Sequence, residues 1–81
     1  MRIDLSKRAV ESILDAPGAV QKAFSKQLAF LENNLHHPSL RAKKFDESAD
    51  LWQARVNGSW RFYFLIQDDA YVIQDVIPHP K

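Results

Sequence analysis

Residues 51–66 read Leu51-Trp-Gln-Ala-Arg-Val-Asn-Gly-Ser-Trp-Arg-Phe-Tyr-Phe-Leu-Ile66, two alternating runs rich in aromatic and β-branched residues around Asn57-Gly58. This pattern is typical of a β-hairpin. A two-residue turn would pair residue 55 with residue 60 and divide the large apolar side chains between the two faces of the sheet. A three-residue loop, 57–59, pairs residue 55 with residue 61 and gathers apolar residues on one face: Trp52, Ala54, Val56, Trp60, Phe62, Phe64 and Ile66. One buried face fixes the register of a hairpin strongly, so we expect the three-residue loop, with Gly58 supplying a positive φ.

This register places Arg55 opposite Arg61 on the polar face of the hairpin, together with Gln53 and Tyr63. Like charges that face each other on a sheet destabilise it by up to about 1 kcal/mol. One interpretation is that both guanidinium groups extend into water, as charged side chains commonly do. The other is that they bind an anion, because two planar forks of donors beside a tyrosine hydroxyl suit a phosphodiester. The hairpin therefore predicts a candidate phosphate site.

The composition limits what kind of protein this is. With 81 residues and 46% hydrophobic content, we expect a single domain over residues 1–81 with one small core. No apolar run is long enough to span a membrane, the first residues are too charged for a signal peptide, and cysteine is absent, so we expect a cytoplasmic protein without a membrane partner. The net charge of +1 is low, so any contact with nucleic acid must come from a local cluster of cations.

The first half of the chain predicts a short strand and two helices. Residues 3–5 fit the strand, and Ser6 is placed to cap a helix that ends near Leu14. Pro17 then fits the first turn of a second helix. Its apolar residues recur at helical spacing: Val20, Phe24, Leu28, Leu31 and Leu35. Residues 39–45 are predicted to be extended.

The last strand, residues 70–77, follows the acidic linker 67–69. A two-residue turn would direct Asp75 into the core, whereas an odd loop places it beside Arg61 on the polar face, so we expect the odd loop. The predicted fold is α+β, with two N-terminal helices packed on a small, mostly antiparallel sheet in the order β-α-α-β-β-β.

Other polar residues could join the two arginines. His79 has the parity of Arg61 near the end of the last strand, and an imidazole can transfer a proton near neutral pH; the alternative is a surface histidine in a frayed tail. Arg41, Lys43 and Lys44 form a basic cluster that either contacts nucleic acid or is a solvated face. The adjacent His36 and His37 lack further ligands at suitable spacing, so we expect no metal and no cofactor.

The order of several short motifs resembles the RelE/ParE superfamily of toxins from bacterial type II toxin-antitoxin systems. The likeness covers nearly the whole chain and lies in His37-Pro-Ser-Leu-Arg-Ala-Lys-Lys44, Leu51-Trp-Gln-Ala-Arg-Val56, Trp60-Arg-Phe-Tyr-Phe64 and Tyr71-Val-Ile73. It implies a microbial RNase-like fold and an antitoxin partner. The RelE branch implies metal-independent, ribosome-dependent cleavage of mRNA by attack of a 2′-hydroxyl, whereas the ParE branch implies non-enzymatic inhibition of DNA gyrase.

The resemblance also implies roles for individual residues. The catalytic set would be Arg61, His79 and Arg55. RNA would contact Arg41, Lys43, Lys44, Tyr63 and Lys81, and the antitoxin would contact an exposed patch on the outer face that includes Leu65, Tyr71 and Ile73. Two departures favour a third possibility, a degenerate member that only binds an antitoxin. Gln53 stands where RelE members often carry a lysine, and the sequence lacks the C-terminal tail of many members.

Overall fold

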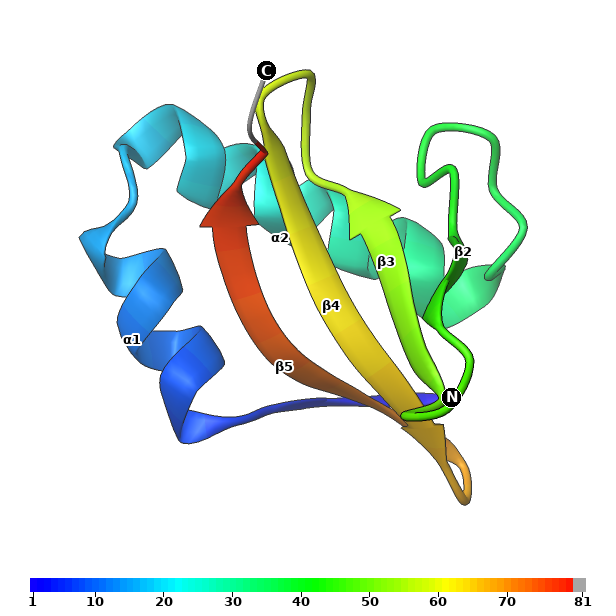
Figure 1. Cartoon of the computed structure of the whole chain (residues 1–81). Coiled ribbons are helices and arrows are strands. Elements are labelled where there is room, and N and C mark those ends of the chain that lie inside the picture. The colour runs from blue at the N-terminus through cyan, green and yellow to red at the C-terminus, as the bar shows by residue number, and fades with distance from the viewer. Residues whose placement is uncertain (80–81) are drawn as a thin grey trace.

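The computed structural model describes residues 1–79 and shows two helices packed against a five-stranded sheet (Figure 1). The strand order is β1-β5-β4-β3-β2, in which β1 runs parallel to β5 and the other neighbours are antiparallel. The elements in chain order are β1 (Arg2–Leu5), α1 (Lys7–Asp15), α2 (Gly18–Asn33), β2 (Lys43–Asp46), β3 (Leu51–Arg55), β4 (Trp60–Gln67) and β5 (Ala70–Pro78). The predicted α+β class and the mostly antiparallel sheet are confirmed. The predicted extended segment contains one additional strand, β2, at the edge of the sheet.

Local signals in the sequence explain where the helices begin. Ser6 Oγ accepts a hydrogen bond from the backbone N–H of Ala9 at 3.0 Å, which confirms the predicted N-cap of α1. Pro17 lies one residue earlier than expected, at the N-cap position of α2. The apolar stripe of α2 faces the sheet, where the ring of Phe24 meets that of Phe62 edge to face at 5.4 Å. Figure 1 shows α2 behind the sheet and α1 beside β5.

The hairpin of β3 and β4 has the predicted register. Arg55 pairs with Arg61, and the backbone N–H of Val56 donates to the carbonyl of Trp60 at 3.0 Å, which closes the three-residue loop. The expected positive φ at Gly58 is wrong. The side chain of Asn57 holds the loop instead, because its Oδ1 accepts from the backbone N–H groups of Ser59 and Trp60 at 2.8 and 3.0 Å.

The predicted odd loop between β4 and β5 is wrong, because Gln67 pairs directly with Ala70 across a two-residue turn. Asp75 nevertheless stays out of the core. The pairing shifts between Tyr63 and the next residue of β4, which leaves Gln74 as the extra residue of a β-bulge. After a bulge, the residues of a strand face the opposite side of the sheet from the one that strict alternation predicts. The predicted odd loop assumed strict alternation along the whole strand. Asp75 consequently lies opposite Tyr63 and not beside Arg61.

The same bulge corrects the predicted antitoxin surface. Before the bulge, Tyr71 and Ile73 face the core and are 6% and 0% exposed, so they cannot form an exposed patch. Leu65 is partly exposed and remains available at the surface. Of the three residues proposed for antitoxin contact, two are therefore part of the core, where Tyr71 meets Phe64 edge to face at 5.7 Å.

Candidate phosphate-binding site

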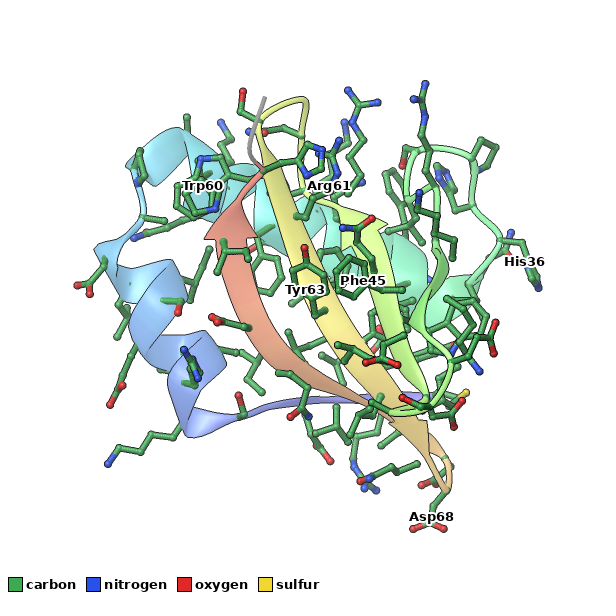
Figure 2. The ribbon with its side chains drawn as sticks, in the orientation of Figure 1. His36, Phe45, Trp60, Arg61, Tyr63 and Asp68 are labelled. Atoms are coloured by element: carbon green, nitrogen blue, oxygen red, sulfur yellow. The ribbon has the colours of Figure 1, made fainter. Side chains whose placement is uncertain are left out.

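A pocket of about 210 Å³ opens on the outer face, which we define as the face of the sheet turned away from α2. The residues that line it come from the loop before β2, from three strands and from the end of β5: Arg41, Lys43, Gln53, Ala54, Arg55, Arg61 and His79. Five of the residues that the sequence singles out as basic or proton-transferring candidates therefore meet in one place. We call this the basic pocket. Figure 2 shows Arg61 at the end of the sheet where the hairpin loop and the last residues of β5 come together.

The hairpin loop positions both Arg61 and His79. Nη1 of Arg61 donates to the backbone carbonyl of Asn57 at 2.7 Å and to that of Trp60 at 3.0 Å, which fixes one edge of the guanidinium group. The backbone N–H of His79 donates to the carbonyl of Ser59 at 2.7 Å, so the end of β5 is attached to the same loop. His79 is therefore held against the hairpin loop and is not part of a frayed tail.

No carboxylate of residues 1–79 neutralises the positive charge of the basic pocket. In the part of the chain that the structure describes, every ion pair lies elsewhere, at Arg2, Arg8 and Lys44. The carboxylate expected beside Arg61, that of Asp75, instead accepts from Ser12 Oγ at 2.7 Å and from Arg8 Nε at 3.2 Å. A cluster of cations without a carboxylate partner favours an anionic ligand.

The end of β3, which carries Arg55, is held by a buried polar contact that the sequence analysis missed. Gln27 on α2 is only 6% exposed, and its Nε2 donates to the carbonyls of Arg55 and Ser39 at 2.8 and 3.1 Å. Ser39 Oγ donates back to Gln27 Oε1 at 3.2 Å. The signal in the sequence is a polar residue on the apolar stripe of α2, three positions after Phe24 and four before Leu31.

The loop between α2 and β2 presents Arg41 in an uncommon backbone conformation. Its φ is 47°, in the left-handed region, which costs a residue other than glycine about 1–2 kcal/mol. Backbone conformations of this kind tend to occur at ligand-binding sites. Arg41 and Arg55 also line a second, wider hollow of about 400 Å³, which lies against α2 and is lined by Lys26 as well. The positive surface therefore continues from the basic pocket toward α2.

Gln53 and Tyr63 form a neutral part of the outer face. Gln53 is 8% exposed, and its Nε2 donates to the hydroxyl of Tyr63 at 3.0 Å. Tyr63 does not line the basic pocket, but its hydrogen-bond partner Gln53 does. The resemblance implies a lysine at position 53, but the side chain there is the amide of Gln53, which orients the hydroxyl of Tyr63.

Lys44, another of the predicted RNA contacts, does not line the basic pocket either. Lys44 pairs with Trp52, whose ring lies 5.4 Å from the Lys44 ammonium, and the carboxylate of Asp50 accepts a hydrogen bond from that ammonium. This hydrogen bond raises the pKa of Lys44 above its usual value. The charge of Lys44 is therefore already compensated. Lys81 lies outside the described residues.

Among residues 1–79, no group of three or more histidine, aspartate or glutamate side chains is placed to hold a metal ion. None of the helices in this part of the chain is long and apolar enough to cross a membrane. The side chains that line the basic pocket can bind an anion through arginine and lysine and can transfer a proton through an imidazole.

Comparisons with known proteins bear on the fold. No protein-family profile matches the chain, and no curated protein matches it significantly. Solved structures do match. RelE from Pyrococcus horikoshii, in its complex with RelB, has a TM-score of 0.77 and 22% identity, covering 95% of this chain and 92% of its own. RelE from Methanococcus jannaschii, in an antitoxin-toxin complex with RelB, has a TM-score of 0.77 and 18% identity, covering 93% and 88%.

The YoeB dimer from Staphylococcus aureus is similar over an even larger share of the chain. Its TM-score is 0.79 at 16% identity, and the match covers 99% of this chain and 98% of that one. At these identities the likeness is one of fold, and it extends over nearly the full length on both sides. The chain has the same fold as these RelE and YoeB structures.

Proposed function

We propose that this protein is the toxin of a toxin-antitoxin pair and that it cleaves mRNA on the ribosome as a metal-independent endoribonuclease. The observation that carries the proposal is the basic pocket, where Arg55, Arg61 and His79 meet without a carboxylate partner among residues 1–79. The RelE-like fold supports the same conclusion. Because mRNA and ribosomes are cytoplasmic, we also assign the protein to the cytoplasm.

The proposed reaction uses only groups of the pocket and of the RNA. The 2′-oxygen of one nucleotide attacks the adjacent phosphorus while the bond to the 5′-oxygen of the next nucleotide breaks, giving a 2′,3′-cyclic phosphate and a 5′-hydroxyl. The proton of the 2′-hydroxyl leaves and one is delivered to the departing 5′-oxygen; His79 takes part in one of these transfers. Arg55 and Arg61 offset the negative charge that builds on the phosphorane oxygens. Arg41 and Lys43 bind a neighbouring phosphate.

The proposed partner is an antitoxin. Solved relatives of similar fold are complexes of RelE with RelB and of YoeB with YefM. In this chain the partly exposed Leu65 remains a candidate contact on the outer face. An antitoxin that covers this face would also reach the basic pocket and neutralise its charge.

The test is primer extension on a reporter mRNA in a purified translation system. Arg61→Ala and His79→Ala are compared with the wild-type chain and with Lys22→Ala, a control that removes an exposed cation of α2 that does not line the pocket. We expect new cuts with the wild type and the control, and a loss of at least about 100-fold with either pocket variant. A parallel reaction without ribosomes measures ribosome dependence. Cuts that persist in Arg61→Ala would contradict the proposal.

One observation favours a candidate without catalytic activity, either a non-enzymatic inhibitor of DNA gyrase or a chain that only binds an antitoxin. Gln53 leaves the pocket without the lysine that the resemblance implies for cleavage. An inhibitor of this kind would produce DNA damage in cells and no cuts in the translation assay. A chain that only binds an antitoxin would produce neither effect and would leave growth unchanged when expressed alone.

A further inference from the structure

Phe45 is the one large aromatic residue among residues 1–79 whose side chain is left exposed, at 57%. It lies in β2 at the point where the pairing with β3 shifts between Lys44 and Asp46. A phenylalanine this exposed adds little to the core, because most of its apolar surface remains in water. Bulges of this kind often direct a side chain toward a functional site.

The ring of Phe45 meets the ring of Tyr63 on the outer face. The ring centres are 5.1 Å apart and the planes are inclined by 69°, an edge-to-face contact. Tyr63 is itself oriented by Gln53, whose amide donates to the Tyr63 hydroxyl at 3.0 Å. Figure 2 shows the two rings side by side over the sheet, on the same face as Arg61. We call Phe45 and Tyr63 the aromatic pair.

The aromatic pair lies next to the basic pocket along two strands. Tyr63 follows Arg61 by two residues in β4, and Phe45 follows Lys43 by two residues in β2. Within the regular part of β4, residues two apart on one face are separated by about 7 Å, which is the spacing of Arg61 and Tyr63. This is close to the distance between the phosphate of a nucleotide and its base. A nucleotide whose phosphate lies in the basic pocket can therefore place its base against the aromatic pair.

From this arrangement we propose that the aromatic pair is a stacking subsite for one unpaired nucleobase of the RNA substrate, with Phe45 as its exposed surface. The inference rests on the proposed nuclease function and adds a positioning residue to it. A ring face stacks on any base, so the subsite binds without reading sequence. By holding the base, it aligns the adjoining phosphate with Arg61 and His79.

The experiment measures single-turnover cleavage in the same translation system over a range of protein concentrations. Phe45→Leu keeps an apolar side chain against Tyr63 but removes the ring, and Phe45→Trp keeps a stacking surface. Phe30→Leu is the matched control, since Phe30 is partly exposed on α2 and stacks on His37. We expect Phe45→Leu to need at least roughly 5-fold more protein than the wild type to reach half its maximal cleavage rate, because it loses one base stack. Phe45→Trp and Phe30→Leu should stay close to the wild type.

A second arm replaces the nucleotides beside the cut, one at a time, by abasic nucleotides. At one position, removal of the base should weaken cleavage by the wild type as much as Phe45→Leu weakens cleavage of intact RNA. Cleavage by Phe45→Leu should not weaken further when the same base is removed. If the wild type cuts and Phe45→Leu cuts equally well, the stacking subsite is wrong and the nuclease proposal stands. If folded wild type makes no cuts, the nuclease proposal fails and the subsite with it.

Discussion

At the scale of single residues, Gln53 decides how much charge the basic pocket offers to RNA. Its buried amide lines the pocket and orients Tyr63. A lysine there would add one cation beside Arg61 while still offering an N–H donor to the Tyr63 hydroxyl. A hydrogen bond to a charged group is worth about 1.5–3 kcal/mol, so we expect Gln53→Lys to raise the rate of mRNA cleavage by about tenfold.

Initial rates in the translation assay check this prediction. The matched control is Gln53→Met, which keeps the length of the side chain without charge or amide and should give no gain. A rate unchanged or lowered in Gln53→Lys would mean that the neutral amide does not limit catalysis. Gln53→Lys also lowers the stability of the free protein, because it adds a cation to a pocket that has no carboxylate partner among residues 1–79.

At the scale of elements, Gln27 connects α2 to the loop before β2 and to the end of β3. Gln27→Leu leaves the carbonyl of Arg55 without its side-chain donor, and burying an unsatisfied acceptor costs about 1–3 kcal/mol. We expect the free energy of unfolding to fall by that amount, measured by urea denaturation, and cleavage to weaken further because Arg41 and Arg55 lose a common support. Gln21→Leu is the control, since its amide bonds only the junction between α1 and α2. An unchanged urea midpoint in Gln27→Leu would contradict this role.

The elements also show how far the sequence could predict the structure. The register of β3 and β4 followed from alternation alone, because apolar residues on one face leave a single pairing. The β4–β5 pairing did not, because the bulge at Gln74 reverses the alternation and its position depends on tertiary packing. Alternation likewise predicts that Arg55 and Arg61 face each other, whereas the bulge explains why Tyr71 and Ile73 face the core and not the outer face. The contacts of Gln27 and Phe45 depend on elements that are distant in sequence, so local patterns could not reveal them.

At the scale of the whole molecule, the net charge is small, but several of the positive charges cluster in the basic pocket. The net charge is +1, yet the cations of the basic pocket have no carboxylate partner among the described residues. A ligand that binds only the folded state stabilises it by mass action. The pocket therefore links anion binding to the stability of the entire fold, and this link can be measured without ribosomes.

The probe is a short 2′-O-methyl RNA oligonucleotide, which carries phosphodiesters but no attacking hydroxyl. At ten times its dissociation constant, binding adds about 1.4 kcal/mol to the free energy of unfolding. For a domain of this size that corresponds to a rise in Tm of roughly 6–11 °C, measured by differential scanning calorimetry. Arg61→Gln should lose most of the rise, whereas Lys22→Gln, which removes an exposed cation of α2, should keep it. The rise should also shrink with added salt, because phosphate contacts release bound counterions. An equal rise in Tm for Arg61→Gln would show that the RNA binds elsewhere on the molecule. The RelE-like fold would then stand, but the basic pocket would not be its RNA-binding site.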